Sequence, residues 1–160
     1  MSSNRTKARK VAEALRPFVD TLLLAQAYAQ LERERVDKIQ RKILADMGYD
    51  KVDPKYVWQQ SDSMTSEFYS RCNAWHLAEG FEDAARGNSP ALVARTLQTE
   101  AEWALISAAE EFFPQCTNDA LLCGNGKVGG LELRQSYLDL LIGLVVNSPG
   151  YVNPLTKIAV

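Results

Sequence analysis

The stretch PFVDTLLLAQAYAQLERERVDKIQRKILADM, from Pro17 to Met47, predicts one long helix. Its apolar residues recur every seven positions and therefore share one helical face: Leu22, Ala29, Val36 and Ile43. After Pro17 the stretch contains neither Gly nor Pro, so nothing in its interior breaks the helix. With a rise of about 1.5 Å per residue the helix would run roughly 45 Å, longer than a small domain is wide. Such a length is typical of a scaffold or an assembly surface.

The far end of the long helix holds the residues that we expect to bind a partner. The other predicted helices are about 20 residues long, which is too short to cover the whole apolar stripe. We therefore expect Val36, Ile39 and Ile43 to be covered by another protein or by a second copy of the chain. Arg35 and Arg41 flank these residues and would lie at the rim of the interface.

The rest of the chain also predicts helices, and strand signals are weak throughout. Pro17 favours a separate short helix over residues 7–15, preceded by a basic flexible arm at residues 1–6. Further helices are expected at about 61–86, 89–113 and 131–147, with a helical turn at 118–122 and a C-terminal tail at 151–160. The expected fold is an all-α bundle of four main helices plus a short N-terminal helix, forming a single domain over residues 1–160.

The composition is that of an ordinary soluble globular protein. The 160 residues are 46% hydrophobic and 24% charged, with a formal net charge of -2. The most apolar run, Tyr137 to Val146, is interrupted by Asp139 and is too short to span a membrane. The same run is apolar nearly all round, which predicts burial on most sides. Three cysteines are an odd number, which favours reduced thiols. We expect a cytoplasmic protein that does not bind membranes.

Positive charge is concentrated at the start of the chain and suggests an alternative function. Arg5, Lys7, Arg9, Lys10 and Arg16 are opposed only by Glu13 in this region. Such an arm can neutralise phosphates, so a nucleic-acid-associated regulator is the first alternative. The basic residues between Arg33 and Lys42 are interleaved with carboxylates, and a pI of about 5.5 argues against a dedicated nucleic-acid binder.

The three cysteines and the single histidine form the second alternative, a zinc-stabilised module. Cys72 and His76 are four residues apart and share a helical face, and Cys116 and Cys123 could complete a tetrahedral Cys3His site. Neither pair has a CxxC knuckle, and free cysteine is usually buried. We therefore expect buried thiols and a partly exposed imidazole, with no metal.

Other patterns do not support an enzyme. The Gly124–Gly130 segment lacks the residue spacing of a P-loop or a dinucleotide-binding motif, and its glycines predict a turn between helices. A Cys72–His76 nucleophile pair lacks a third residue to orient the base. The carboxylates on the 89–113 helix have no matching ExxH partner and are expected on its solvated face: Glu100, Glu102, Glu110 and Glu111. We expect no catalytic residues and no cofactor.

In size and helical make-up the chain resembles small accessory proteins of tailed bacteriophages and mobile elements. This resemblance rests on no diagnostic residue and covers no particular stretch. It implies an accessory, structural or inhibitory role. The sequence as a whole predicts a non-enzymatic protein that works by binding another protein or itself.

Overall fold

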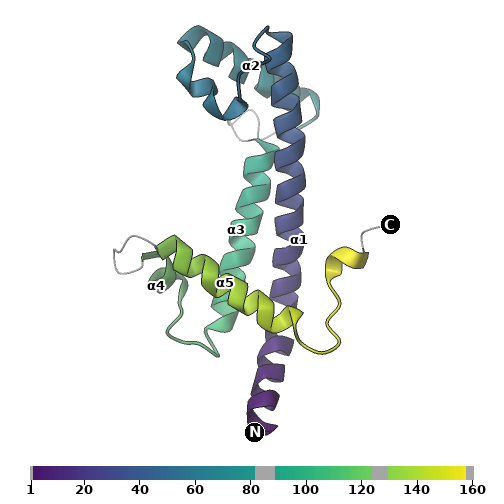
Figure 1. Ribbon diagram of the computed structural model, residues 1–160, viewed down its shortest axis with the longest axis vertical. Coiled ribbons are helices and arrows are strands. Elements are labelled where there is room, and N and C mark those ends of the chain that lie inside the picture. Colours follow the sequence, from purple (N-terminus) through teal and green to yellow (C-terminus); the bar gives the residue numbers. More distant parts are fainter. Residues whose placement is uncertain (1, 82–88, 124–129, 158–160) are drawn as a thin grey trace. The chain divides into compact units, whose positions relative to one another are not determined.

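The computed structural model describes residues 2–81, 89–123 and 130–157, and this part of the chain is helical without strands (Figure 1). The all-α prediction is therefore confirmed. The longer helices are α1 (Ser2–Asp46), α2 (Asp62–Ala78), α3 (Pro90–Ala109) and α5 (Gly130–Val146). Shorter ones are the 3-10 helix η1 (Pro54–Gln59), α4 (Asn118–Cys123) and the 3-10 helix η4 (Pro154–Lys157).

The chain forms two compact units. Unit 1 comprises residues 1–26 and 97–160, and unit 2 comprises residues 27–96. Helices α1 and α3 each contribute residues to both units. The single-domain organisation remains a prediction.

Helix α1 runs through Pro17 without a break, so the prediction of a separate short helix is wrong (Figure 1). The expected flexible arm is also helical from Ser2 onward. Proline inside a helix removes one backbone hydrogen bond and costs about 3 kcal/mol. Apolar residues on both sides of Pro17 enter the same core, Leu15 before it and Val19 after it, and each is fully buried. A break at Pro17 would separate these two residues, so their packing in one core favours the continuous helix.

The core of unit 1 is built where α5 crosses α1 and α3 (Figure 1). Its buried residues come from four helices: Leu15, Val19 and Leu22 of α1, Ala101, Leu105, Ile106 and Ala109 of α3, Leu121 of α4, and Leu138, Leu141 and Val145 of α5. An ion pair also joins two of these helices, since Arg134 Nη1 of α5 lies 3.3 Å from Glu102 Oε1 of α3. Glu102 is thus largely buried, with a side chain only 15% exposed, and the prediction that it is solvated is wrong.

The core of unit 2 is smaller and combines the end of α1 with η1 and α2. It contains Leu44, Val57, Met64, Phe68 and Cys72. The α2 residues follow each other at four-residue steps, which is the spacing of one helical face.

Left-handed glycines follow the C-terminal ends of α1 and α2 in this unit. Gly48 has φ of 89° and follows α1, with Tyr49 N–H donating to the Leu44 carbonyl at 2.8 Å. Gly80 has φ of 83° and ends α2 in the same way, with Phe81 N–H donating to the His76 carbonyl at 3.0 Å. The stop after Met47 is confirmed, whereas α2 ends at Ala78 rather than near residue 86, because Gly80 adopts the C-cap conformation.

Among the helices that the structure describes, none has both the length and the apolar character needed to cross a membrane.

Candidate functional site

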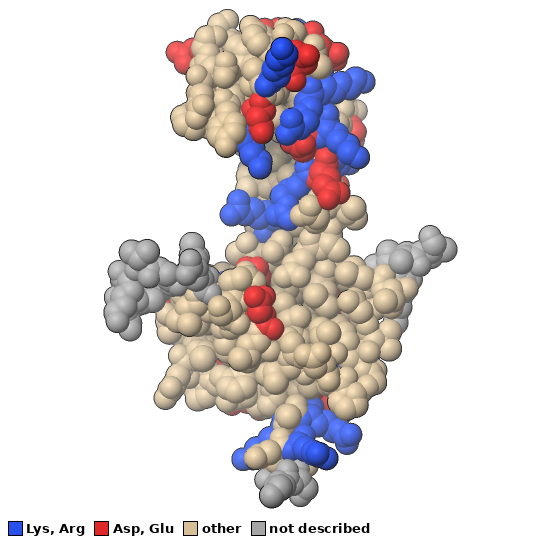
Figure 2. Space-filling model, in the orientation of Figure 1, with Lys and Arg blue, Asp and Glu red and all other residues tan. Residues whose placement is uncertain are grey.

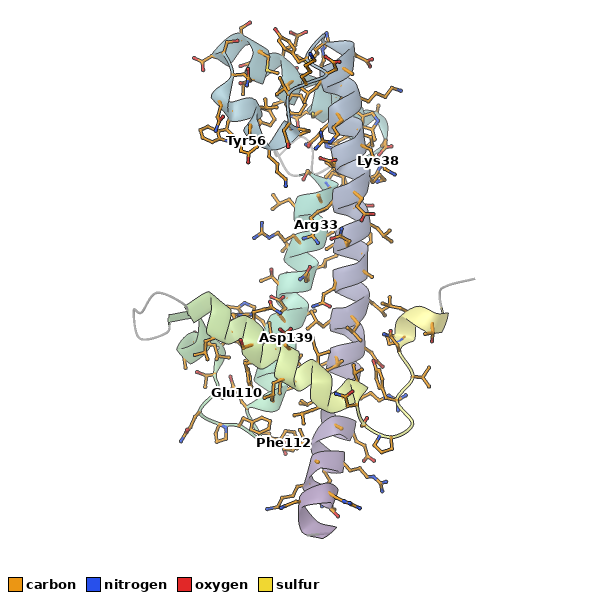
Figure 3. The ribbon with its side chains drawn as sticks, in the orientation of Figure 1. Arg33, Lys38, Tyr56, Glu110, Phe112 and Asp139 are labelled. Carbon is orange, nitrogen blue, oxygen red and sulfur yellow. The ribbon has the colours of Figure 1, made fainter. Side chains whose placement is uncertain are left out.

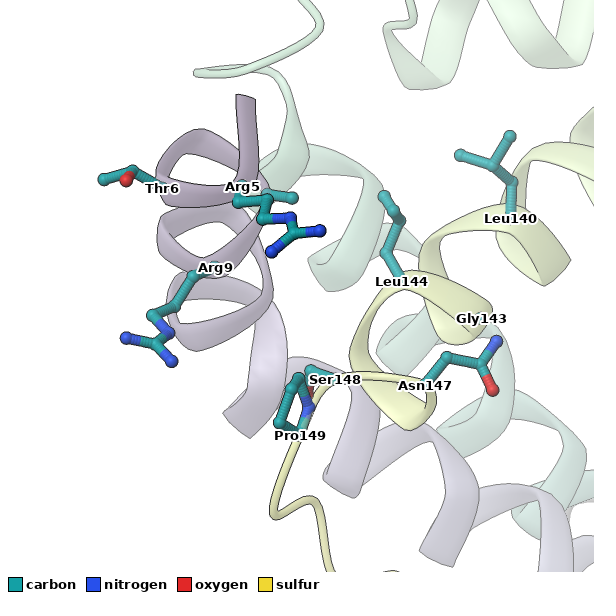
Figure 4. Close-up of a pocket in the computed structure, with 10 residues that line it drawn as sticks. Arg5, Thr6, Arg9, Leu140, Gly143, Leu144, Asn147, Ser148 and Pro149 are labelled. Carbon is teal, nitrogen blue, oxygen red and sulfur yellow. The ribbon is translucent and has the colours of Figure 1, made fainter. Parts of the chain in front are cut away.

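An open groove lies in unit 1 between the first turns of α1 and the C-terminal half of α5 (Figure 4). Its volume is about 980 Å³, at the upper end of the range of ligand sites in proteins. Arg5, Thr6, Ala8 and Arg9 line it from α1, and Leu140, Gly143, Leu144, Asn147, Ser148 and Pro149 line it from α5 and the turn that follows. The lining contains two cations and no carboxylate.

The α1 wall carries the positive charge. Arg5 extends from α1 toward Leu144 of α5, whereas the guanidinium of Arg9 points away from α5 and borders the groove (Figure 4). Figure 2 shows Lys and Arg side chains gathered at this end of α1, while the adjoining face of unit 1 is mostly uncharged and carries one group of Asp or Glu side chains further from the groove's basic wall. The first turn of α1 contains no acidic residue. The positive end of the helix dipole therefore adds to the positive potential of these side chains.

The α5 wall is aliphatic. Leu140 is 55% exposed, and Leu144, one turn further on, is half-buried and packs on the core of unit 1. The most buried face of α5 carries Leu138, Leu141 and Val145, and the helical period places Leu140 away from it. Asp139, labelled in Figure 3, also lies off that face and is exposed. The prediction that α5 is buried on most sides is wrong at Leu140. The sequence signal that could have predicted an exposed side of this helix was Asp139, a charged residue within the apolar run.

The stripe residues predicted to bind a partner lie in unit 2. Val36 is only 5% exposed, and Ile39 and Ile43 are half-buried. Ile43 packs against the core of unit 2. The expected lack of cover therefore does not hold at Val36, because residues of the same chain bury it. The assignment of these residues as partner contacts remains a prediction, now without its original reason.

The two arginines predicted at the rim make ion pairs within unit 2. Arg35 Nη1 lies 2.9 Å from Glu79 Oε2, its Nη2 lies 3.0 Å from Glu32 Oε2, and its guanidinium stacks 5.4 Å from the centre of the Trp75 ring. Hydrogen bonds to Glu32 and Glu79 raise the pKa of Arg35. Arg35 therefore joins α1 to α2, and a partner would have to compete with these contacts.

Arg41 makes a weaker set of contacts than Arg35. Its Nε lies 2.8 Å from Asp37 Oδ2, and its Nη2 lies 3.8 Å from Asp53 Oδ2. The hydrogen bond to Asp37 raises the pKa of Arg41. Its side chain is 52% exposed, so Arg41 is the more accessible of the two arginines.

The residues of the zinc hypothesis are divided between the two units. Cys72 and His76 belong to unit 2 and Cys116 to unit 1, and the side chain of Cys123 lies outside the described residues. Burial raises the pKa of the Cys72 thiol to about 11, which disfavours the thiolate that a metal or a nucleophilic reaction needs. Within the described part of the chain, no group of three or more His, Cys, Asp or Glu side chains could hold a metal ion.

His76 is more enclosed than we expected. It is 3% exposed and lies between Trp75 and Phe81, with ring centroids at 4.7 and 6.2 Å. Burial lowers its pKa, although the nearby carboxylate of Glu79 opposes that shift. The prediction of a partly exposed imidazole is therefore wrong, because the four-residue step from Cys72 places His76 on the inner face of α2.

A second exposed surface lies on η1 in unit 2. Trp58 is 66% exposed and Tyr56 is 51% exposed, and Tyr56 projects outward in Figure 3. Their neighbour Val57 is fully buried and holds η1 against α2. Of the predicted turn at Gly124–Gly130, residues 124–129 lie outside the described residues and Gly130 begins α5.

Comparison of the chain with protein-family models, with curated proteins and with solved structures finds no significant match.

Proposed function

We propose that this chain is a non-enzymatic protein-interaction or assembly protein that binds another protein, or a second copy of itself, through the groove of unit 1. The observation that carries the proposal is Leu140, a leucine left 55% exposed beside the groove on a helix that has a complete buried face of its own. A leucine in that position adds nothing to the core of the monomer. Burying it against a partner would remove its apolar surface from water.

A role as an accessory, structural or inhibitory protein of a phage or mobile element is part of the same proposal. It rests on the resemblance in size and helical make-up, and the exposed apolar side chain in the groove would suit binding to the surface of another protein. The exposed Trp58 and Tyr56 of unit 2 support a binding role as well, because Trp and Tyr are enriched at protein interfaces.

The experiment compares two substitutions on α5. Leu140→Asp places a charge at the groove, and Leu133→Asp is the matched control, because Leu133 is 56% exposed on the same helix but does not line the groove. Each tagged protein is used for nuclease-treated affinity capture from cells in which the chain naturally occurs. The mass of each purified protein is measured by light scattering, with multiples of 17.8 kDa indicating self-association.

We expect the Leu140→Asp variant either to capture one protein fewer than the unmodified chain or to have the mass of a monomer in solution. The Leu133→Asp variant should give the same captured proteins and the same mass as the unmodified chain. Identical captured proteins and identical masses for all three would contradict the proposal. Retention that depends on intact DNA or RNA, and that ends with nuclease treatment, would instead favour the nucleic-acid-associated regulator.

A further inference from the structure

The groove of unit 1 has two chemically different walls with the same repeat. On α1, Arg5 and Arg9 are four residues apart; on α5, Leu140 and Leu144 are also four residues apart. Four residues advance a helix by about 6 Å, so Leu140 and Leu144 lie one turn apart on the α5 wall. On the α1 wall, Arg5 extends toward α5 and Arg9 lies at the border of the groove. A ligand that satisfies both walls needs aliphatic groups repeated at about one helical turn, with anionic groups beside them.

The cations of the groove are not neutralised by the chain itself. No described residue forms an ion pair with Arg5 or Arg9, and the groove lining contributes no carboxylate. By contrast, Arg35, Arg71 and Arg134 each have a carboxylate partner within 3.3 Å. Positive charge at the N-terminal end of a helix is electrostatically unfavourable, and an anionic partner would reverse that effect.

The lining favours a protein segment over a polynucleotide. Single-stranded nucleic acid is held by aromatic side chains that stack on its bases, and no aromatic residue lines this groove. Leu140 and Leu144 offer instead the aliphatic surface on which the apolar face of an amphipathic helix docks.

We propose that the groove binds an acidic amphipathic helix of a partner protein, an inference that rests on the interaction function proposed above. Aliphatic side chains of that helix pack on Leu140 and Leu144, and its Asp or Glu side chains pair with Arg5 and, at the border, with Arg9. Binding by such a segment weakens with salt, because its charged contacts lie at an open groove.

The test uses the full chain and fluorescein-labelled designed peptides of about 16 residues, followed by fluorescence anisotropy. One peptide carries Leu on one helical face with Glu beside it, a second has the same composition in scrambled order, and a third has Lys in place of Glu. A labelled single-stranded oligothymidylate of similar length is the nucleic-acid probe. Each titration is run at low and at high salt.

Two double variants have the same change in charge on the same helix. Arg5→Glu with Arg9→Glu alters the groove residues, and Lys7→Glu with Lys10→Glu alters residues that do not line it. We expect the groove variant to bind the Leu/Glu peptide roughly tenfold more weakly than the unmodified chain, and the control variant to bind it with nearly unchanged affinity. The scrambled and Lys peptides should bind weakly to all three proteins. Circular dichroism confirms that each variant is folded.

Equal weakening in both double variants would show general charge attraction and would overturn the proposal. So would absence of binding to the Leu/Glu peptide, or tighter binding to the oligothymidylate. A dimer that the groove variant alone dissociates would assign the groove to a second copy of the chain. That last result would leave the proposed interaction function intact, as would a partner lost by Leu140→Asp but kept by the Arg5/Arg9 variant. The two proposals can therefore fail separately.

Discussion

Breaking the buried ion pair of unit 1 should destabilise that unit strongly. The side chain of Arg134 is 7% exposed and that of Glu102 is 15% exposed, and their charged atoms lie 3.3 Å apart. Replacing Glu102 with Met leaves the guanidinium enclosed between α3 and α5 without its partner. Removing one member of a buried pair costs about 3–5 kcal/mol, because the remaining charge is desolvated and no longer has an oppositely charged partner. A small domain is stable by only about 5–15 kcal/mol.

The pair is measured by a double-mutant cycle. We expect Glu102→Met and Arg134→Met each to lower the free energy of unfolding by about 3–5 kcal/mol. The free energy of unfolding of the double variant should be much closer to that of the unmodified protein, because an apolar pair replaces the two charges. Glu100→Met is the control on α3, since Glu100 is exposed and should change stability by no more than about 0.5 kcal/mol.

The assay is urea unfolding followed by the fluorescence of Trp103, the only tryptophan of unit 1, in a background with Trp58 and Trp75 changed to Phe. This background makes the signal specific for one unit, whether or not the two units unfold together. Single substitutions that each cost under about 1 kcal/mol, with additive effects in the double variant, would refute the reasoning. The pair would then behave like an exposed one.

Two further predictions concern the other unit and the proline of α1. Burial lowers the pKa of His76 below its ordinary 6.5, so the unfolded chain binds the proton first as the pH falls. Unit 2 should therefore keep its full stability above about pH 6.5. Below that pH its free energy of unfolding should fall by at most about 1.4 kcal/mol per pH unit. Urea titrations at pH 7.5 and 5.5, followed by Trp75 fluorescence, check this, and an equal slope in His76→Leu would contradict it. Pro17→Ala should raise the unfolding free energy of unit 1 by about 2 kcal/mol, since alanine restores the missing N–H donor in α1. Unchanged or lower stability in the Trp103 assay would mean that α1 gains nothing from an unbroken hydrogen-bond ladder.

The elements that the sequence predicted correctly are those with strong local signals. Gly48 and Pro90 mark helix ends because each has a backbone property that other residues lack: access to positive φ in one case and a missing N–H in the other. The apolar repeat of α1 also depends only on helical geometry, and Leu22, Ala29 and Val36 are buried along it.

Which side chains meet across helices could not be read from the sequence. On α3, Ile106 is fully buried, whereas Leu97, an equally apolar residue of the same helix, is 48% exposed. A periodic pattern defines a face but not which part of that face a neighbour covers. The groove of unit 1 shows the same limit, because Arg5 and Leu144 are far apart in the chain and are brought together only by packing.

By itself, the sequence determined that this protein is all-α, that one long helix follows Pro17 and stops before Gly48, and that positive charge collects at the start of the chain. Those properties follow from backbone propensity, periodicity and charge, which act within a few residues. Only the tertiary structure decided that α1 passes through Pro17, that Val36 is buried, and that Leu140 remains exposed in the groove that Arg5 also lines. Each of these depends on how residues distant in sequence compete for a limited buried volume, and that competition is settled only when the helices pack.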